Sequence, residues 1–209
     1  MKKAILAVLF TAMCSTQALA EQPYVSASMG YGTMNDSGSF SYNGTSYRDV
    51  VSFDSGTPWE IAFGIRNDDN RVEVALGYQN NKIDTVSGLS SLYGYSFSEI
   101  EVKTRSIMLN GYHDFALENS EISPYLMAGI GSMNLKESVS GTEYGDINKF
   151  AWQLGAGIGY KATENITLDI SYRYFATADI TFESAGAGFS DATYSIGGSR
   201  VLAGVRYGF

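Results

Sequence analysis

The one histidine in the chain, His113, is the first residue to test for hydrolytic chemistry. A serine nucleophile needs a histidine base within hydrogen-bond reach, and the histidine needs a carboxylate that orients it. His113 is followed by Asp114 and Phe115, and no serine stands two residues further on. We therefore interpret His113 as an interface side chain, and a hydrolase or acyl transferase is the weakest of three functional hypotheses.

Cofactor and metal chemistry find no support in the sequence. The single cysteine, Cys14, lies in the first 20 residues, so residues 21–209 contain no thiolate ligand and no disulfide. No glycine-rich phosphate loop with a following lysine occurs, and no histidine or carboxylate cluster has metal-ligand spacing. We expect no cofactor, no metal and no enzymatic activity.

Charged residues of both signs recur at alternate positions within otherwise apolar segments. These residues are Glu60, Arg66, Glu73, Asp169, Arg173 and Arg206. Alternate residues of a strand share one face, and buried charges must be paired. We therefore expect internal ion pairs in which Arg173 and Arg206 neutralise carboxylates of this set.

The segments that carry these charges repeat with a period of two residues, which is typical of β-strands. In "TPWEIAFGIR", for example, the large apolar residues alternate with Glu60, Ala62 and Gly64. The pattern predicts eight strands, at residues 23–33, 57–67, 70–81, 99–115, 121–135, 149–162, 165–177 and 196–209. The alternation is irregular in the fourth and fifth of these, so the facing of their side chains is left open.

The connections between the strands alternate in length. Three are tight turns, near residues 67–70, 116–120 and 162–165, and four are long polar segments, at residues 34–56, 82–98, 136–148 and 178–195. The strands are therefore joined by short turns at one end of the sheet and by long loops at the other. We find no boundary between domains within residues 21–209.

The face opposite the large apolar residues is small rather than charged. It includes Ala62, Gly64, Gly155, Gly157 and Gly159. Glycine weakens an exposed strand, but it suits a narrow barrel interior, where there is little room for side chains. The apolar face then meets lipid, and the sheet must close because lipid supplies no partner for a free edge.

The sequence thus predicts an all-β fold, an eight-stranded antiparallel up-and-down transmembrane β-barrel. Its outward aromatic residues fall into two bands, as expected at the two membrane interfaces. One band has Tyr31, Trp59, Tyr78, Phe150, Trp152, Tyr172 and Tyr174, and the other has Phe115, Tyr160, Tyr207 and Phe209. A soluble lipocalin-like barrel or sandwich is the alternative.

The first 20 residues have the pattern of a secretory signal. Lys2 and Lys3 precede the apolar run 4–12, and Ala18-Leu19-Ala20 forms a small-residue cleavage site. We expect residues 1–20 to be a cleaved signal peptide and residues 21–209 to be the barrel domain. Loss of the two lysines would change the formal net charge from −8 to −10, and such an acidic chain is a poor candidate for binding nucleic acid.

Several segments resemble the small eight-stranded outer-membrane proteins, a group that includes the OmpA transmembrane domain, OmpX and the opacity-protein and NspA-like surface antigens. The resemblance rests on "ISPYLMAGIGSMNL", "AWQLGAGIGYKATENITLDISYRYF" and the final "VRYGF". It implies a monomer in a Gram-negative outer membrane, in contact with its lipid and lipopolysaccharide. It also implies that Val205, Tyr207 and Phe209 form a signal read by the barrel-assembly machinery. The chain ends with the barrel, unlike full-length OmpA.

Two of the long loops carry aromatic residues that suit recognition of a host or cell-surface ligand, because tyrosine gives contact area at low entropic cost. The candidates are Tyr42, Tyr47, Phe53, Tyr93, Tyr95 and Phe97. The alternative, that they extend the strands and pack on one another, remains open.

The sequence therefore favours a structural or surface-interaction protein, adhesin-like in its loops. A narrow channel for ions or small solutes is the second hypothesis, ahead of the lipid-modifying enzyme. Within the barrel, the internal charges could form either a gated conduit or a plug of salt bridges. We favour the plug, because eight strands enclose only enough space for their own side chains.

Overall fold

The computed structural model describes residues 22–35, 37–42, 45–86, 100–139, 142–178, 180–182 and 192–209. The expected signal peptide, residues 1–20, lies outside this part of the chain. Every regular element of the described residues is a β-strand. No helix long and apolar enough to cross a membrane occurs among them.

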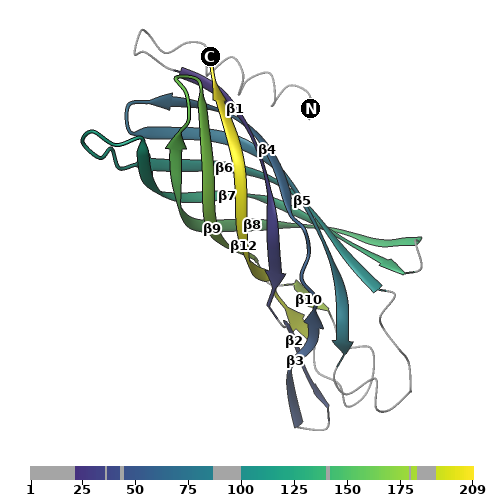
Figure 1. The fold of residues 1–209 in the computed structure, drawn as a ribbon. Coiled ribbons are helices and arrows are strands. Elements are labelled where there is room, and N and C mark those ends of the chain that lie inside the picture. The colour runs from purple at the N-terminus through teal and green to yellow at the C-terminus, as the bar shows by residue number, and fades with distance from the viewer. Residues whose placement is uncertain are drawn as a thin grey trace.

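Eight strands form the wall of a closed barrel (Figure 1). They are β1 (Gln22–Met34), β4 (Trp59–Asn67), β5 (Asn70–Val86), β6 (Ile100–Asp114), β7 (Ile122–Val139), β8 (Thr142–Lys161), β9 (Ile166–Thr177) and β12 (Gly197–Gly208). Each pairs antiparallel with its neighbours in the order β1-β4-β5-β6-β7-β8-β9-β12. The predicted eight-stranded antiparallel barrel is confirmed.

The barrel closes between its first and last strands. The register of β1 and β12 runs without interruption from Tyr24 opposite Gly208 to Met34 opposite Gly198. Beyond it, the backbone N–H of Phe209 donates to the carbonyl of Pro23 at 3.0 Å. This ladder supplies hydrogen-bond partners for the backbone N–H and C=O groups of both strands, which lipid could not supply.

Tight turns join the wall strands at one end, which we call the turn end. Strands β4 and β5 are joined by residues 68–69, β6 and β7 by residues 115–121, and β8 and β9 by residues 162–165. Asp68 and Asn119 have positive φ angles there, which Asp and Asn tolerate better than other non-glycine residues. In Figure 1 the C-terminus lies at this end of the barrel.

The opposite end, the loop end, contains more strand than the sequence predicted. Four further strands pair in the order β10-β11-β2-β3 and join β5: β2 (Ser37–Tyr42), β3 (Thr45–Phe53), β10 (Ile180–Phe182) and β11 (Ala192–Tyr194). Strands β7 and β8 also continue their ladder as far as Val139 opposite Thr142.

The prediction of polar loops at 34–56 and 136–148 was therefore wrong for most of their length. Alternating aromatic, β-branched and hydroxyl residues favour a strand whether or not it lies in lipid. The dipeptide Asn43-Gly44 between β2 and β3 is a strong signal for a two-residue hairpin turn. Polar composition was thus a poor guide to the absence of regular structure here.

Large apolar side chains point away from the barrel along every wall strand. On β4, Trp59, Ile61 and Phe63 are 40–49% exposed, whereas Glu60 is 6% exposed. The structure also settles the facing of the two irregular strands. On β6, Ile107 and Leu109 point outward and Met108 and Tyr112 inward; on β7, Leu126 and Ile130 point outward and Met127 and Met133 inward. Both faces of these strands carry bulky residues, which is why the period was obscured.

Candidate functional site: the interior of the barrel

In the half of the interior nearer the turn end, a single carboxylate is the centre of a hydrogen-bond network. Glu73 on β5 accepts hydrogen bonds from Tyr24 on β1 at 3.0 Å and from Asn110 on β6 at 3.1 Å, and a further one from the hydroxyl of Tyr112. Gln153 on β8 extends the network by donating to Asn110 at 2.6 Å. Four strands are therefore linked through groups that lipid cannot reach.

Beside this network, Arg71 on β5 and Asp114 on β6 form a bidentate ion pair. Both nitrogen-to-oxygen distances are 2.8 Å, and both side chains are 3% exposed. The guanidinium carbon of Arg71 lies 4.2 Å from the ring centre of Tyr112 and 4.8 Å from that of Tyr125. A planar guanidinium suits this combination of a two-pronged pair and aromatic faces.

The sequence did not single out this pair. Arg71 follows the first tight turn, and Asp114 immediately precedes the second. The available signal was positional: once the turns are located, both residues must lie at the same end of adjacent strands. Asp114 was instead read only as the neighbour of His113.

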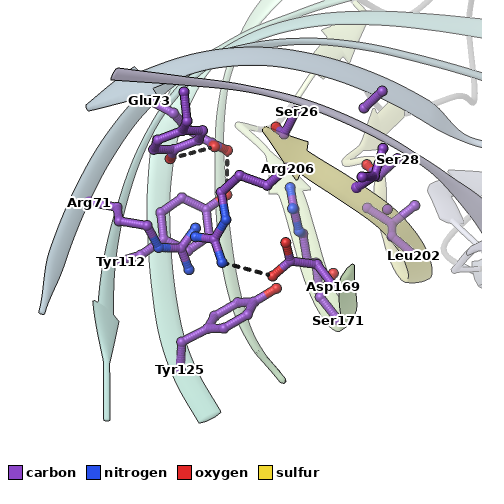
Figure 2. A pocket seen from close by; sticks show the side chains of 15 residues that line it. Ser26, Ser28, Arg71, Glu73, Tyr112, Tyr125, Asp169, Ser171, Leu202 and Arg206 are labelled. Carbon is purple, nitrogen blue, oxygen red and sulfur yellow. Dashed lines mark hydrogen bonds and ion pairs between the residues drawn. The ribbon is translucent and has the colours of Figure 1, made fainter. Parts of the chain in front are cut away.

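Two further ion pairs use residues that the sequence singled out, one across the interior and one between neighbouring strands. Arg173 on β9 reaches across the interior to Glu60 on β4, with a nitrogen-to-oxygen distance of 2.7 Å. Arg206 on β12 lies 3.5 Å from Asp169 on the adjacent β9. Figure 2 shows Arg206 and Asp169 facing each other beside Tyr125.

Arg66 differs from the other marked charges. Its Nε donates to the backbone carbonyl of Asp68 at 2.9 Å in an exposed position. Strand β4 ends at Asn67, so Arg66 stands at the rim of the barrel and holds the turn. Glu73, the remaining marked residue, is paired with neutral donors rather than with an arginine.

A second chain of hydrogen bonds begins at Arg200, nearer the loop end of the barrel. The sequence did not indicate this chain. Its Nε donates to Gln79 at 2.6 Å, Gln79 donates to Asn81 at 2.7 Å, and Asn81 donates to the carbonyl of Asp54 at 2.7 Å. The guanidinium carbon also lies 4.2 Å from the ring centre of Phe175. Amide side chains therefore connect β12 to β5 and to the segment before β4.

Near the loop end the interior becomes apolar. Its buried residues are Met34, Met108, Met133, Leu135, Ala151, Phe175 and Ile196. Phe53 and Ile147 pack against this cluster from the loop side. We call this set the apolar cluster. It fills the interior between the charged network and the loop end.

Small residues on the inner face make room for the network, as the sequence suggested. A Cβ on Gly129 would lie 2.1 Å from Asn110 Oδ1, and one on Gly157 would lie 2.5 Å from the ring of Tyr125. Real Cβ contacts do not reach such distances, so neither position accepts a larger residue unless its neighbours move. The glycines therefore bring wall backbone and interior side chains close together.

The space that remains in the charged half is small. A cavity of about 30 Å³ is bordered by residues that include Tyr24, Arg71, Tyr125, Asp169 and Arg206. That volume suits about one or two water molecules. Among the described residues, Arg206 Nη1 and Arg173 Nε are buried without a hydrogen-bond partner, and water in this cavity would supply one. A sugar or an amino acid would not fit.

The predicted recognition residues are only partly within the described region. Phe53 is half-buried against the apolar cluster, which agrees with the packing alternative for this one residue. Tyr42 and Tyr47 belong to β2 and β3, but their side chains lie outside the description, and Tyr93, Tyr95 and Phe97 lie outside it entirely.

His113 lies on the outside of the barrel, at the turn end. Its Nδ1 is 3.0 Å from Asn70 Oδ1, and its ring meets Phe115 edge-on with 4.9 Å between the ring centres. These are the contacts of an interface side chain. No group of three histidine, cysteine or carboxylate residues within the described ranges could hold a metal ion.

The closed barrel, with its apolar exterior and charged interior, is similar to known proteins of one family. Residues 4–209 match the model of the outer membrane protein beta-barrel domain. The chain belongs to this family. It is therefore an outer-membrane β-barrel protein of Gram-negative type, in agreement with the predicted location. Such barrels have short periplasmic turns and longer extracellular loops, so the turn end faces the periplasm.

Two curated relatives and one solved structure illustrate the likeness. The outer membrane protein PagN of Salmonella typhimurium is 29% identical over 123 residues, which are 52% of this chain and 51% of that protein. The 25 kDa outer-membrane immunogenic protein of Brucella canis is 28% identical over 130 residues, 58% of this chain and 59% of that protein. The chain thus matches little more than half the length of these relatives. Neisserial surface protein A has the same fold, with a TM-score of 0.59 at 21% identity, over 90% of this chain and 97% of that one.

Proposed function

We propose that this protein is a surface-interaction protein, in which a sealed outer-membrane barrel displays an extracellular sheet and loops that bind a ligand on another cell or surface. The observation that carries the proposal is the filling of the barrel. Ion pairs fill the interior toward the periplasm, and the apolar cluster fills it toward the loop end, together with the hydrogen-bonded chain of Arg200, Gln79 and Asn81. A barrel filled in this way is suited to holding its outer end rigid rather than to passing solutes.

The extracellular end is built to present a surface. Strands β10, β11, β2 and β3 pair side by side and are joined to β5 of the wall. Sites placed on rigid elements hold their geometry better than sites on free loops. The names of two relatives, an immunogenic protein and a surface protein, support exposure at the cell surface in the same sense.

The test replaces the β2–β3 hairpin, residues 37–53, by a two-residue turn in cells that otherwise lack the protein. A matched control shortens only the β7–β8 hairpin beyond Leu135 and Ile147. We expect the first variant to lose adhesion to host epithelial cells or extracellular-matrix proteins while it keeps its folded amount in the outer membrane. Equal adhesion by wild type, both variants and cells without the protein would refute the proposal.

A narrow channel is the second candidate, and one observation favours it. The cavity of about 30 Å³ is lined by Arg173 and Arg206, and each of these arginines has one buried nitrogen without a hydrogen-bond partner among the described residues, so a small polar space remains within the barrel. Planar-bilayer conductance of the purified protein decides between the candidates. Discrete openings that disappear in Arg206→Gln would favour the channel.

The remaining parts of the proposal concern catalysis, assembly and oligomeric state. We propose that the protein has no enzymatic activity, because the exposed ring of His113 lies against Asn70 and Phe115 rather than beside a nucleophile among the described residues. We propose that it is a monomer, because the β1–β12 ladder leaves no wall strand with a free edge. Tyr207 and Phe209, whose ring centres are 5.3 Å apart at the periplasmic rim, suit recognition by the assembly machinery.

A further inference from the structure

The outer wall of strands β5, β6 and β7 carries positive charge at the extracellular boundary of the membrane. Leu76 and Ile107 form one of the last apolar rows of this wall, opposite each other on β5 and β6. One step further out, the same face of β6 carries Arg105, and the next step carries Lys103. Each step along a strand face is about 7 Å. The cations therefore lie directly beyond the apolar band.

The strand register gathers further polar groups around these two cations. Arg105 lies opposite Tyr78 on β5 and Asn134 on β7. Lys103 lies opposite Lys136 on β7. Like charges opposite each other on adjacent strands are unfavourable, and an anion between them relieves the repulsion. Lys103 and Lys136 also have contacts within the protein, so the anion would add to these contacts rather than replace missing ones.

Arg105 is the clearest single element of this site. Its side chain is exposed, and within the described residues no hydrogen bond or ion pair holds it. The chain as a whole is acidic, with a formal net charge of −8, so a group of cations on one outward face is not a general property of its surface. On the opposite wall, at similar height, the outward groups are uncharged, such as Tyr172 and Ser199, whose hydroxyls are 2.7 Å apart.

A groove runs along the wall at the same place. It has a volume of about 330 Å³, and its outward lining residues include Trp59, Leu76, Tyr78, Ile107 and Ser132. Arg105, Asn134 and Asn148 border it as well. Apolar side chains thus lead directly to a guanidinium and two amides, which is the arrangement that an acyl chain ending in a phosphorylated headgroup requires.

We propose that this wall, which we call the β5–β7 lipid site, binds one phosphorylated glycolipid of the outer leaflet. An acyl chain lies in the groove, and Arg105, Lys103 and Lys136 contact headgroup phosphate. A guanidinium presents two parallel donors to a phosphate, and lysine adds point charge. The complementary signs of the cations and the phosphates, together with the apolar groove beside them, select this ligand over a zwitterionic or neutral lipid.

The experiment measures lipid retention by native mass spectrometry on the folded protein in non-ionic detergent. The probe is hexa-acylated diphosphoryl lipid A, with the dephosphorylated form and phosphatidylcholine as comparison lipids. Inorganic phosphate is added in a separate arm, to distinguish a lipid headgroup from a free phosphate. Folding of every variant is checked by its heat-modifiable migration.

We expect the diphosphoryl form to bind in a one-to-one complex and to resist millimolar inorganic phosphate. Arg105→Gln should weaken it about tenfold, as expected for the loss of one charge-assisted contact, and the triple variant Arg105→Gln, Lys103→Gln, Lys136→Gln should weaken it further. Ser132→Trp, which fills the groove and keeps every charge, should also weaken binding. Lys161→Gln is the matched control, because Lys161 is an exposed cation near the periplasmic end of β8.

Each of the following results would overturn the proposal. The first is a folded triple variant that binds as tightly as wild type. The second is a loss in Lys161→Gln equal to that in Arg105→Gln, which would mean general charge attraction. The third is equal binding of the dephosphorylated lipid or complete displacement by inorganic phosphate. Unchanged binding by Ser132→Trp would contradict the placement of an acyl chain in the groove.

Discussion

The two halves of the barrel interior are filled by different kinds of contact. Nearer the periplasm, arginines meet carboxylates of adjacent strands, as Arg71 meets Asp114, and Arg173 reaches across the interior to Glu60. In the extracellular half, Met108, Met133 and Phe175 pack together, and the Arg200 guanidinium lies against the ring of Phe175. The first kind depends on direction and on both partners being present, whereas the packing of the methionines depends mainly on volume. The two halves should therefore respond in opposite ways to conservative substitutions.

The largest expected effect is the loss of one partner from a buried ion pair. Arg173→Ala leaves the carboxylate of Glu60 buried without its cation, which typically costs about 3–5 kcal/mol. We expect the urea midpoint of unfolding in lipid vesicles to fall substantially. The control is the double variant Glu60→Leu, Arg173→Met, which removes both charges and should recover much of the loss. A single variant with a wild-type midpoint would mean that the pair contributes nothing to stability.

A smaller effect is expected in the apolar half, and it should depend on size rather than chemistry. Met133 is 1% exposed, so Met133→Ala should destabilise the barrel by about 2–5 kcal/mol. Met133→Leu keeps the volume and should cost less than about 1.5 kcal/mol. The same unfolding measurement applies. If the volume-conserving change were as harmful as the truncation, the two halves would not differ in the way proposed.

The same contrast explains how much of the protein was predictable from its sequence. Alternation gives a strand and its lipid face, so the wall and its outward residues, such as Trp59 and Ile61, followed directly. Arg173 and Arg206 were marked for the same reason. Their partners could not be chosen, because Glu60 and Arg173 are 113 positions apart and the pairing depends on which strands face each other across the closed barrel.

The apolar cluster escaped prediction for a related reason. Met108 and Met133 lie on the inner face of strands whose outer face is also bulky, so no two-residue period separates core from lipid. Gln79 and Asn81 were likewise uninformative by type, since an amide is as common on a solvated face as in a buried chain. Only the closed geometry shows that both are 0–1% exposed.

Outside the interior, the closing strand offers a weaker test. Phe209 packs edge-on against Tyr207, with 5.3 Å between the ring centres, and aromatic pairs of this kind contribute about 0.5–1.5 kcal/mol. Phe209→Ala should therefore reduce the folded, heat-modifiable fraction in the outer membrane while synthesis and export continue. Gly208→Ala is the control, since a Cβ there would meet only Asn165 O, at 3.9 Å. Equal folded fractions in wild type and Phe209→Ala would mean that the side chain of Phe209 does not contribute to assembly and that the last strand serves only to close the barrel.

The last prediction is that solute passage through the barrel is absent, and it tests both halves of the interior together. Liposomes that contain the wild-type protein should show no sugar-dependent swelling above empty liposomes, because the cavity beside Asp169 and Arg206 has a volume of about 30 Å³, too small for a sugar. Each half should block the barrel independently, so Arg173→Ala alone or Phe175→Ala alone should also give no swelling. The combined variant removes one side chain from each half and is the one in which swelling would first be expected. Reproducible swelling by the wild type would mean that the barrel opens in the membrane, and the channel would then replace the sealed scaffold as the better account of its function.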